Sequence, residues 1–177
     1  MARAFGAPVP QAEVVTVPPG LPWTAGTDEF DAQLQRSWGP NLGVTHVEGA
    51  RHATARDVAA LSPREASAIA SADRFLANVD RGPPNPNLLV GPGGRVVAID
   101  YGACLFLSRA LSGRVGEVAL PPGHLLPQAA PAPIPPLPWD ALSADLPGTW
   151  IAAAGADRGA LLAALAVYEA AARAAWD

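Results

Sequence analysis

Apolar and polar positions recur with a helical period in the segment that follows Ser62. Ser62 can cap a helix, Pro63 suits the first helical position, and Glu65 closes a capping box with Ser62. The pattern therefore predicts a helix that starts at Pro63 and runs to about Asn78. One stripe along it is mostly core-facing at helical spacing: Ala66, Ile69, Ala70, Asp73 and Leu76 or Ala77.

Two short apolar runs follow this helix. Residues 87–90 and residues 95–99 flank the glycine-rich segment Gly91-Pro-Gly-Gly94. Such runs around a glycine-rich turn predict a β-hairpin. The second run ends directly at Asp100-Tyr101-Gly102.

The rest of the chain predicts a mixture of helices and strands. We expect a last helical turn at 1–5, a strand at 13–17, a short helix at 27–36, a loop with a short strand at 41–48, and helices at 103–111, 139–146 and 156–176. In the last helix, Leu162, Leu165, Tyr168 and Ala172 are a plausible buried face. The predicted fold class is α+β, mainly helical with one β-hairpin.

Composition narrows the class of protein. The chain has 177 residues, is half apolar and carries a net charge of −4, which fits a globular domain and argues against a nucleic-acid partner. Its longest apolar runs are shorter than a bilayer span, and its first residues lack the apolar region of a signal peptide. We therefore expect no membrane association and a cytoplasmic location.

Prolines cluster between Pro121 and Pro138. A run of this composition favours extended backbone. It can serve as a spacer laid over a surface or as a motif that a partner binds.

The segment that joins the predicted helix to the hairpin carries the candidate chemistry. Asp80 is followed five residues later by Asn85, and Asp100 follows the hairpin. Phosphoryl transfer needs a group that orients or deprotonates the acceptor hydroxyl, and oxygen ligands for Mg²⁺. Asp, Asn, Pro and Gly are also turn residues, so a rigid turn is the alternative interpretation.

Two residues close to Asp80, one basic and one an amide, are further candidates for the site. Arg81 can hold the loop or a phosphate, and Asn78 can hydrogen-bond the loop backbone. The sequence contains no lysine, and all twelve of its basic residues are arginine. The lysine that pairs with nucleotide phosphates in kinases is thus missing from this polypeptide.

Residues 71–90 together with residues 97–103 resemble the HipA-like kinase family, which is related to the HipA serine/threonine kinases and more distantly to the phosphoinositide kinases. The resemblance implies that Asp80 is the catalytic base and that Asn85 and Asp100 bind Mg²⁺, with Asn87 as an alternative ligand. It also implies ATP as cofactor. Arg81 and Asn78, the two neighbours of Asp80 considered above, are the predicted cofactor-binding residues. Tyr101 departs from the histidine that is frequent at this position in the family.

The resemblance also implies an organisation of the chain. It is a single kinase-like domain fragment with a hinge-like segment at 1–50, a catalytic-loop core at 51–115, a proline-rich connection at 116–140 and C-terminal helices at 141–177. Residues 3–10 resemble the end of the N-lobe helix and the approach to the hinge, so the N-lobe is absent or vestigial.

Several functional states remain open on this reading. The chain can be an N-terminally truncated phosphotransferase acting on the hydroxyl of a protein or small molecule, or a separate chain can supply the missing N-lobe. It can also be a pseudokinase that binds a partner without chemistry. We expect weak or absent ATP binding, and no activity, from this chain alone.

Other reactive side chains are expected to be structural. His46, His52 and His124 form no catalytic triad with an acid and a nucleophile, and we expect surface or packing roles for them. Cys104 is expected to be a buried thiol. Trp23 and Trp38 are alternative candidates for lining an adenine pocket near the hinge.

Overall fold

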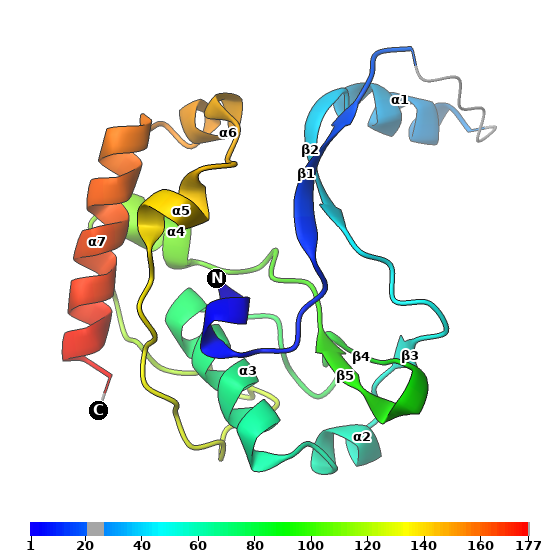
Figure 1. Cartoon of the computed structure of the whole chain (residues 1–177), viewed down its shortest axis with the longest axis vertical. Helices are drawn as coiled ribbons and strands as arrows, with labels where there is room; N and C mark the ends of the chain where they lie inside the picture. The colour runs from blue at the N-terminus through cyan, green and yellow to red at the C-terminus, as the bar shows by residue number, and fades with distance from the viewer. Residues whose placement is uncertain (21–26, 177) are drawn as a thin grey trace.

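The computed structural model describes residues 1–20 and 27–176, which form an α+β fold of short helices and small sheets (Figure 1). This confirms the α+β part of the predicted fold class. In chain order the elements are η1 (Ala2–Phe5), β1 (Ala12–Val17), α1 (Asp28–Arg36), β2 (Gly39–Val44), β3 (Arg51–His52), α2 (Ala55–Ala59), α3 (Pro63–Leu76), β4 (Leu88–Val90), η2 (Pro92–Gly94), β5 (Val96–Ala98), α4 (Phe106–Leu111), α5 (Trp139–Ser143), α6 (Gly148–Ala153) and α7 (Arg158–Ala174).

Helix α3 is the central element and begins where the sequence predicts. The Ser62 hydroxyl accepts a hydrogen bond from the Glu65 amide at 3.2 Å, and the Glu65 carboxylate accepts one from the Ser62 amide at 3.0 Å. This capping box satisfies amide groups that the first helical turn leaves without a partner. The helix ends at Leu76, two residues before the predicted end, because Ala77 adopts the left-handed conformation with φ 52°.

Aromatic side chains join α3 to both ends of the chain. The Phe75 ring lies 5.4 Å from that of Phe5, and it meets the Tyr168 ring edge-on at 5.5 Å. Tyr168 also donates its hydroxyl to the Phe75 carbonyl at 2.8 Å. These contacts fix the last turn of α3, from which the candidate site emerges.

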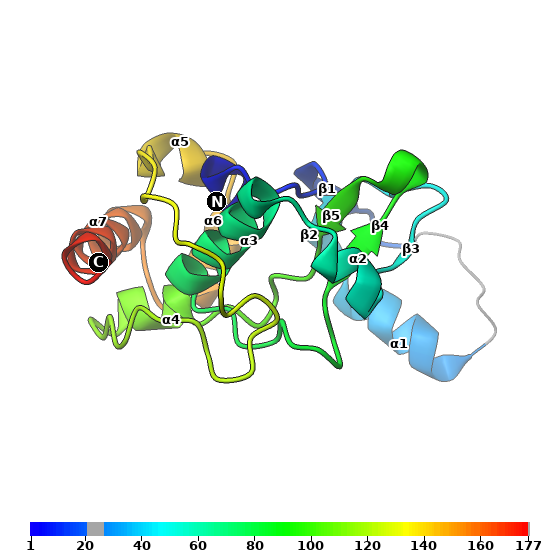
Figure 2. The same cartoon turned by 90° about the horizontal axis from the view of Figure 1, so that it is seen from below.

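Helix α7 packs by a face that differs by one residue from the prediction. Its buried residues are Leu161, Leu165, Tyr168 and Ala172. Leu161 replaces the predicted Leu162 because its spacing to Leu165 and Tyr168 keeps all four on one side of the helix. Figure 2 shows α7, α5 and α4 on one side of α3, and the small sheet on the other.

That sheet contains the predicted hairpin. Strands β4 and β5 are antiparallel, with Leu88 opposite Ala98 and Val90 opposite Val96. Strand β3 adds a third strand on the other side of β4, which the sequence pattern does not predict. The Ala98 amide also donates to the Pro8 carbonyl at 2.6 Å, so the residues after η1 cover the free edge of β5.

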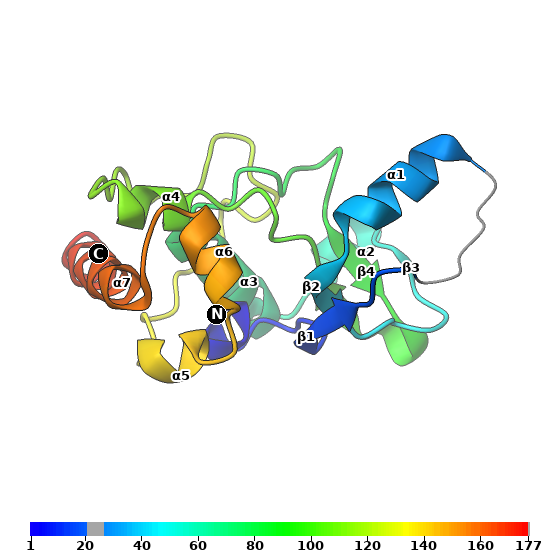
Figure 3. The same cartoon turned by 90° about the horizontal axis from the view of Figure 1, so that it is seen from above.

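Strands β1 and β2 form a separate antiparallel ribbon. Ala12 pairs with Val44 and Val17 with Gly39. The ribbon carries α1 at its far end and extends away from α3 and the sheet (Figure 1). In the view from above, the ribbon and α1 lie in front of the sheet (Figure 3). Several of its apolar side chains are exposed, among them Val14, Leu42 and Val44.

The proline-rich segment lies along the body of the protein. Its residues Val118, Leu126, Ile134 and Leu137 are buried. The Arg74 side chain donates to the Val118 carbonyl at 2.6 Å, and the Ala132 amide donates to the Ser71 hydroxyl at 2.7 Å. This arrangement fits a spacer laid over a surface better than a free partner motif. Among the helices of the described residues, none combines the length and the apolar character needed to cross a membrane.

Candidate active site

Unusual backbone conformations gather around the loop between α3 and β4. Ala77, Asn87 and Asp100 are the non-glycine residues with positive φ in the described part of the chain, at 52°, 47° and 52°. Each such residue costs on the order of 1 kcal/mol or more, and such residues cluster where function requires a fixed geometry. They stand at the entrance of the loop, at its exit, and at the end of β5, which directs attention to these segments.

The Asp80 carboxylate is the focus of the loop. Its Oδ2 accepts hydrogen bonds from the side-chain amides of Asn85 at 2.9 Å and Asn87 at 3.2 Å. The amide of Asn87 also donates to the Asp80 carbonyl at 3.3 Å. Within the described residues, Asp80 Oδ1 accepts no hydrogen bond and remains available to a ligand.

The loop is closed by short backbone contacts. Gly82 and Asn85 exchange two backbone hydrogen bonds, at 3.2 and 3.0 Å. The Asp80 amide donates to Asn78 Oδ1 at 3.2 Å. Asn78 therefore holds the loop backbone, as one of its two predicted roles requires.

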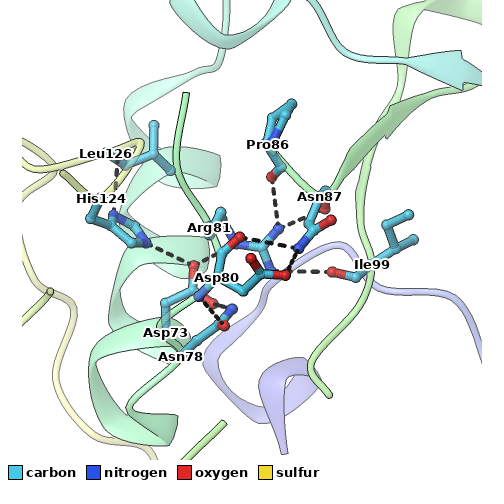
Figure 4. A network of polar contacts seen from close by, with 9 residues as sticks. All are labelled: Asp73, Asn78, Asp80, Arg81, Pro86, Asn87, Ile99, His124 and Leu126. Carbon is cyan, nitrogen blue, oxygen red and sulfur yellow. Dashed lines mark hydrogen bonds and ion pairs between the residues drawn. The ribbon is translucent and has the colours of Figure 1, made fainter. Parts of the chain in front are cut away.

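Asp73, one helical turn before the end of α3, anchors the loop from below (Figure 4). Its Oδ1 accepts a hydrogen bond from the Asn78 amide at 2.8 Å, and its Oδ2 accepts one from Arg81 Nε at 2.6 Å. Asp73 and Asn78 are fully buried, and Arg81 is 1% exposed. A buried carboxylate needs such partners, because an unpaired charge in the interior is strongly unfavourable.

Arg81 connects the buried Asp73 to the rest of the site. Its guanidinium donates to the carbonyls of Pro86 at 3.1 Å, Asn87 at 2.6 Å and Ile99 at 3.3 Å (Figure 4). The Ile99 amide in turn donates to the Asn87 carbonyl at 2.9 Å. Arg81 thus ties the loop to the end of β5, and the residues that follow Asp80 and precede Asp100 are joined directly.

In this geometry Arg81 takes the first of its two predicted roles. Its side chain holds the loop, and the four hydrogen bonds that it donates all end on protein oxygens. The Asn78 amide is likewise buried and bonded to Asp73. As placed, both residues lie under the loop and are bonded to protein groups, and their contact with a cofactor stays a prediction.

Asp100 is exposed and its conformation depends on the glycine two residues on. Its Oδ1 accepts a hydrogen bond from the Gly102 amide at 3.1 Å. A Cβ at position 102 would lie 3.1 Å from the same oxygen, closer than side chains ordinarily approach. Glycine at position 102 therefore leaves room for this conformation of the Asp100 carboxylate.

Two carboxylates near the loop have no basic side chain paired with them in the described part of the chain. Arg81 is paired with Asp73, whereas neither Asp80 nor Asp100 forms an ion pair with a basic residue among the described positions. The amides of Asn85 and Asn87 turn their nitrogens to Asp80, and their oxygens accept no hydrogen bond from residues 1–20 or 27–176. Two carboxylates and two amide oxygens match the preference of a hard divalent cation such as Mg²⁺.

No group of three or more His, Cys, Asp or Glu residues with metal-site geometry occurs in the described ranges. Any metal site at this loop would thus depend on the asparagine oxygens together with Asp80 and Asp100. The chemistry of the donors fits a cation that binds few side chains and keeps several waters, as Mg²⁺ does.

Two weakly acidic groups lie beside the buried ion pair. Burial and the nearby Asp73 carboxylate raise the pKa of the Tyr101 phenol above its usual value, and the same two causes raise the pKa of the Cys104 thiol to about 12. The Tyr101 ring lies over the Arg81 guanidinium at 5.0 Å, while its hydroxyl has no hydrogen-bond partner in the described structure. Cys104 is half-buried rather than fully buried as predicted, and its raised pKa favours the protonated thiol over the nucleophilic thiolate.

The structure brings Asp80, Asn85 and Asn87 together, and the Arg81 contact to the Ile99 carbonyl ties the residue before Asp100 to the same loop. Sequence reasoning missed two residues: it placed Asp73 on the buried stripe without a role, and it expected only a surface or packing role for His124, which contacts Asp73 at 3.1 Å. An acid on an apolar helical stripe was the available signal for Asp73. Trp38 is 45% exposed between α1 and β2, and Trp23 lies outside the described residues.

Comparisons with known proteins give no relative: no family model, no curated protein and no solved structure matches this chain. The assignment of function therefore has to stand on the site itself.

Proposed function

We propose that the chain carries the catalytic-loop half of a HipA-like kinase, an ATP- and Mg²⁺-dependent phosphotransferase acting on a protein or small-molecule hydroxyl. The observation that carries the proposal is the state of the Asp80 carboxylate. Asn85 and Asn87 fix one of its oxygens, and the other is free of protein hydrogen bonds. A held carboxylate with one free oxygen can orient an acceptor hydroxyl and take its proton.

The proposed cation ligands are Asn85 and Asp100, with Asn87 as the alternative. Mg²⁺, when bound, neutralises charge between the phosphates of the nucleotide. The support in this chain is the uncompensated charge of Asp80 and Asp100 and the free amide oxygens beside them. The Arg81 contact to Ile99 keeps the two halves of this donor set together.

The nucleotide base has a proposed location beside the hinge-like segment. A cavity of about 380 Å³ is lined by residues 8–11 and 45–48 together with Pro92, Arg95 and Val97. Val97 lies in β5, three residues before Asp100. Three residues of chain span at most about 10 Å, so the cavity lies within that distance of the proposed cation site.

The phosphates lack an obvious partner in this polypeptide. It has no lysine, and Arg81, the arginine next to the proposed base, is occupied under the loop. We expect the chain alone to bind Mg·ATP weakly or not at all and to transfer no phosphate. These two observations also favour the second candidate function, a pseudokinase that binds a partner without chemistry.

The test is a titration of the isotope-labelled chain with Mn²⁺, a paramagnetic substitute for Mg²⁺, followed by NMR. The amide signals of Asn85, Asn87 and Gly102 should broaden first, and excess Mg²⁺ should reverse the broadening. Asp100→Asn should weaken the effect, because it removes a charged ligand. Asp145→Asn, at an exposed acid in the α5–α6 connection, is the matched control and should leave it unchanged. Equal broadening in wild type and Asp100→Asn would contradict the proposed cation site.

A further inference from the structure

His124 connects the proline-rich segment to the anchor of the loop. It lies 51 positions from Asp73 in the sequence, and the distance from His124 Nε2 to Asp73 Oδ2 is 3.1 Å (Figure 4). Both side chains are fully shielded from solvent. His124 therefore contacts the same carboxylate oxygen that Arg81 uses.

The hydrogen bonds fix the tautomer of His124. The Leu126 amide donates to His124 Nδ1 at 3.1 Å, so Nδ1 carries no proton and acts as an acceptor. Nε2 then carries the proton and donates a hydrogen bond to Asp73. Asp73 thus receives three donors in total, from Asn78, Arg81 and His124.

The same segment holds the loop at a second point. The Leu125 amide donates to the Arg81 carbonyl at 3.0 Å. Residues 124–126 therefore bind both the backbone of Arg81 and the carboxylate that orients its side chain. Because Arg81 in turn binds the carbonyls of Asn87 and Ile99, this grip extends to the residues that present the proposed cation ligands.

We propose that His124 is a positioning residue of the candidate site, acting through Asp73 and Arg81 on Asn85, Asn87 and Asp100. The importance of His124 for catalysis rests on the proposed function. Its effect on the order of the loop does not. This role assigns the proline-rich segment 121–138 a part in forming the site, beyond that of a spacer. Removing a side chain that hydrogen-bonds a metal-binding residue commonly lowers the metal affinity by about tenfold or more.

The test compares His124→Gln with His124→Leu. The Gln amide can still donate to Asp73, whereas Leu fills similar space without a donor. NMR should detect the protected Arg81 Nε–H signal and the ordered side-chain amides of Asn85 and Asn87 in wild type and in His124→Gln. His124→Leu should lose these signals and reduce Mn²⁺ affinity at least about tenfold. His52→Gln, at an exposed histidine, is the control and should behave as wild type.

Two results would overturn the proposal. Unchanged Arg81 and asparagine signals in His124→Leu would reduce His124 to a packing residue. Nitrogen shifts of the wild-type imidazole that place the proton on Nδ1 would remove the donor to Asp73, and this measurement decides the matter even where His124→Leu does not fold. Should wild type not bind Mn²⁺, the proposed function fails at its cation site, while the loop signals still test His124.

Discussion

Arg81 Nε and Asp73 Oδ2 are 2.6 Å apart, and neither side chain is accessible to solvent. Among the ion pairs of the described residues, only this pair and the His124 contact to the same carboxylate are fully buried. As a consequence, the loop after α3 depends on a charge balance that water cannot replace.

Asp73→Asn should therefore destabilise the protein strongly. The substitution keeps the shape of the side chain but leaves the Arg81 charge buried without a counter-ion, which costs about 3–5 kcal/mol. Urea unfolding followed by tryptophan fluorescence measures the free energy of unfolding. Asp145→Asn, the exposed control, should change it by less than about 0.5 kcal/mol. Equal effects of the two substitutions would show that Asp73 carries no buried charge balance.

Asp80→Asn should separate chemistry from binding. In a preparation where phosphoryl transfer occurs, with the phosphate-binding lysine supplied by an additional chain or segment, the substitution should lower turnover by about 10²–10⁴-fold and spare nucleotide affinity. Asp100→Asn should instead weaken Mg²⁺-dependent nucleotide binding. Steady-state kinetics and calorimetric titration measure the two quantities. A comparable loss of turnover in Asp28→Asn, an acid in the first turn of α1, would contradict the role given to Asp80.

Gly102→Ala should disturb the site without unfolding the protein. The added methyl group would meet Asp100 Oδ1 at 3.1 Å, so the carboxylate has to turn away from the Gly102 amide. We expect Mn²⁺ binding to weaken about as much as in Asp100→Asn, with a stability loss of about 1 kcal/mol from the lost hydrogen bond.

Gly148→Ala is the control for this experiment. Position 148 begins α6, and no atom lies within 4 Å of a Cβ built there. Alanine in a compatible position stabilises by about 0.4–1 kcal/mol, since it restricts the unfolded chain. A weaker Mn²⁺ affinity in Gly148→Ala would mean that the readout does not report on Asp100.

Cys104 should react slowly with thiol reagents at pH 8. Burial raises the pKa of its thiol from 9.0 to about 12, which lowers the thiolate fraction by roughly a thousandfold, since the reactive form is the thiolate. Because the native state holds the proton more tightly, stability from this group is present below pH 9 and falls as the pH rises towards 12. Cys104→Ala should flatten that alkaline decline. Fast labelling of the folded protein at pH 8 would contradict the half-buried, protonated state.

Much of the local structure could be predicted because local signals agree. The capping box of Ser62 and Glu65 fixed the start of α3, and the glycine-rich turn fixed the hairpin. Strand β3 was missed because two residues, Arg51 and His52, become a strand only by pairing with β4, nearly forty positions away. The short helices α2 and α6 were missed for a related reason, since five or six residues give too little periodicity to recognise.

The candidate site divides in the same way. Asp80, Asn85 and Asp100 follow from spacing in the sequence, whereas the network beneath them does not. His124 stands among prolines, where composition indicates extended backbone but not which side chain enters the interior. Asp73 was visible as a polar residue on a buried stripe, yet its partners Arg81 and His124 arrive from different parts of the chain.

The β1–β2 ribbon has a consequence for how the chain opens. Two strands without a covering layer are marginal in water, because little apolar surface opposes the entropy gained on opening. The backbone amides of Val14 and Leu42 should exchange with deuterium long before those of Val97, which lies in the covered sheet. A protease should likewise cut the ribbon first and leave α3, the hairpin and the Asp73 network intact. The chain would then consist of two units of unequal stability, and the candidate site would lie in the more stable unit.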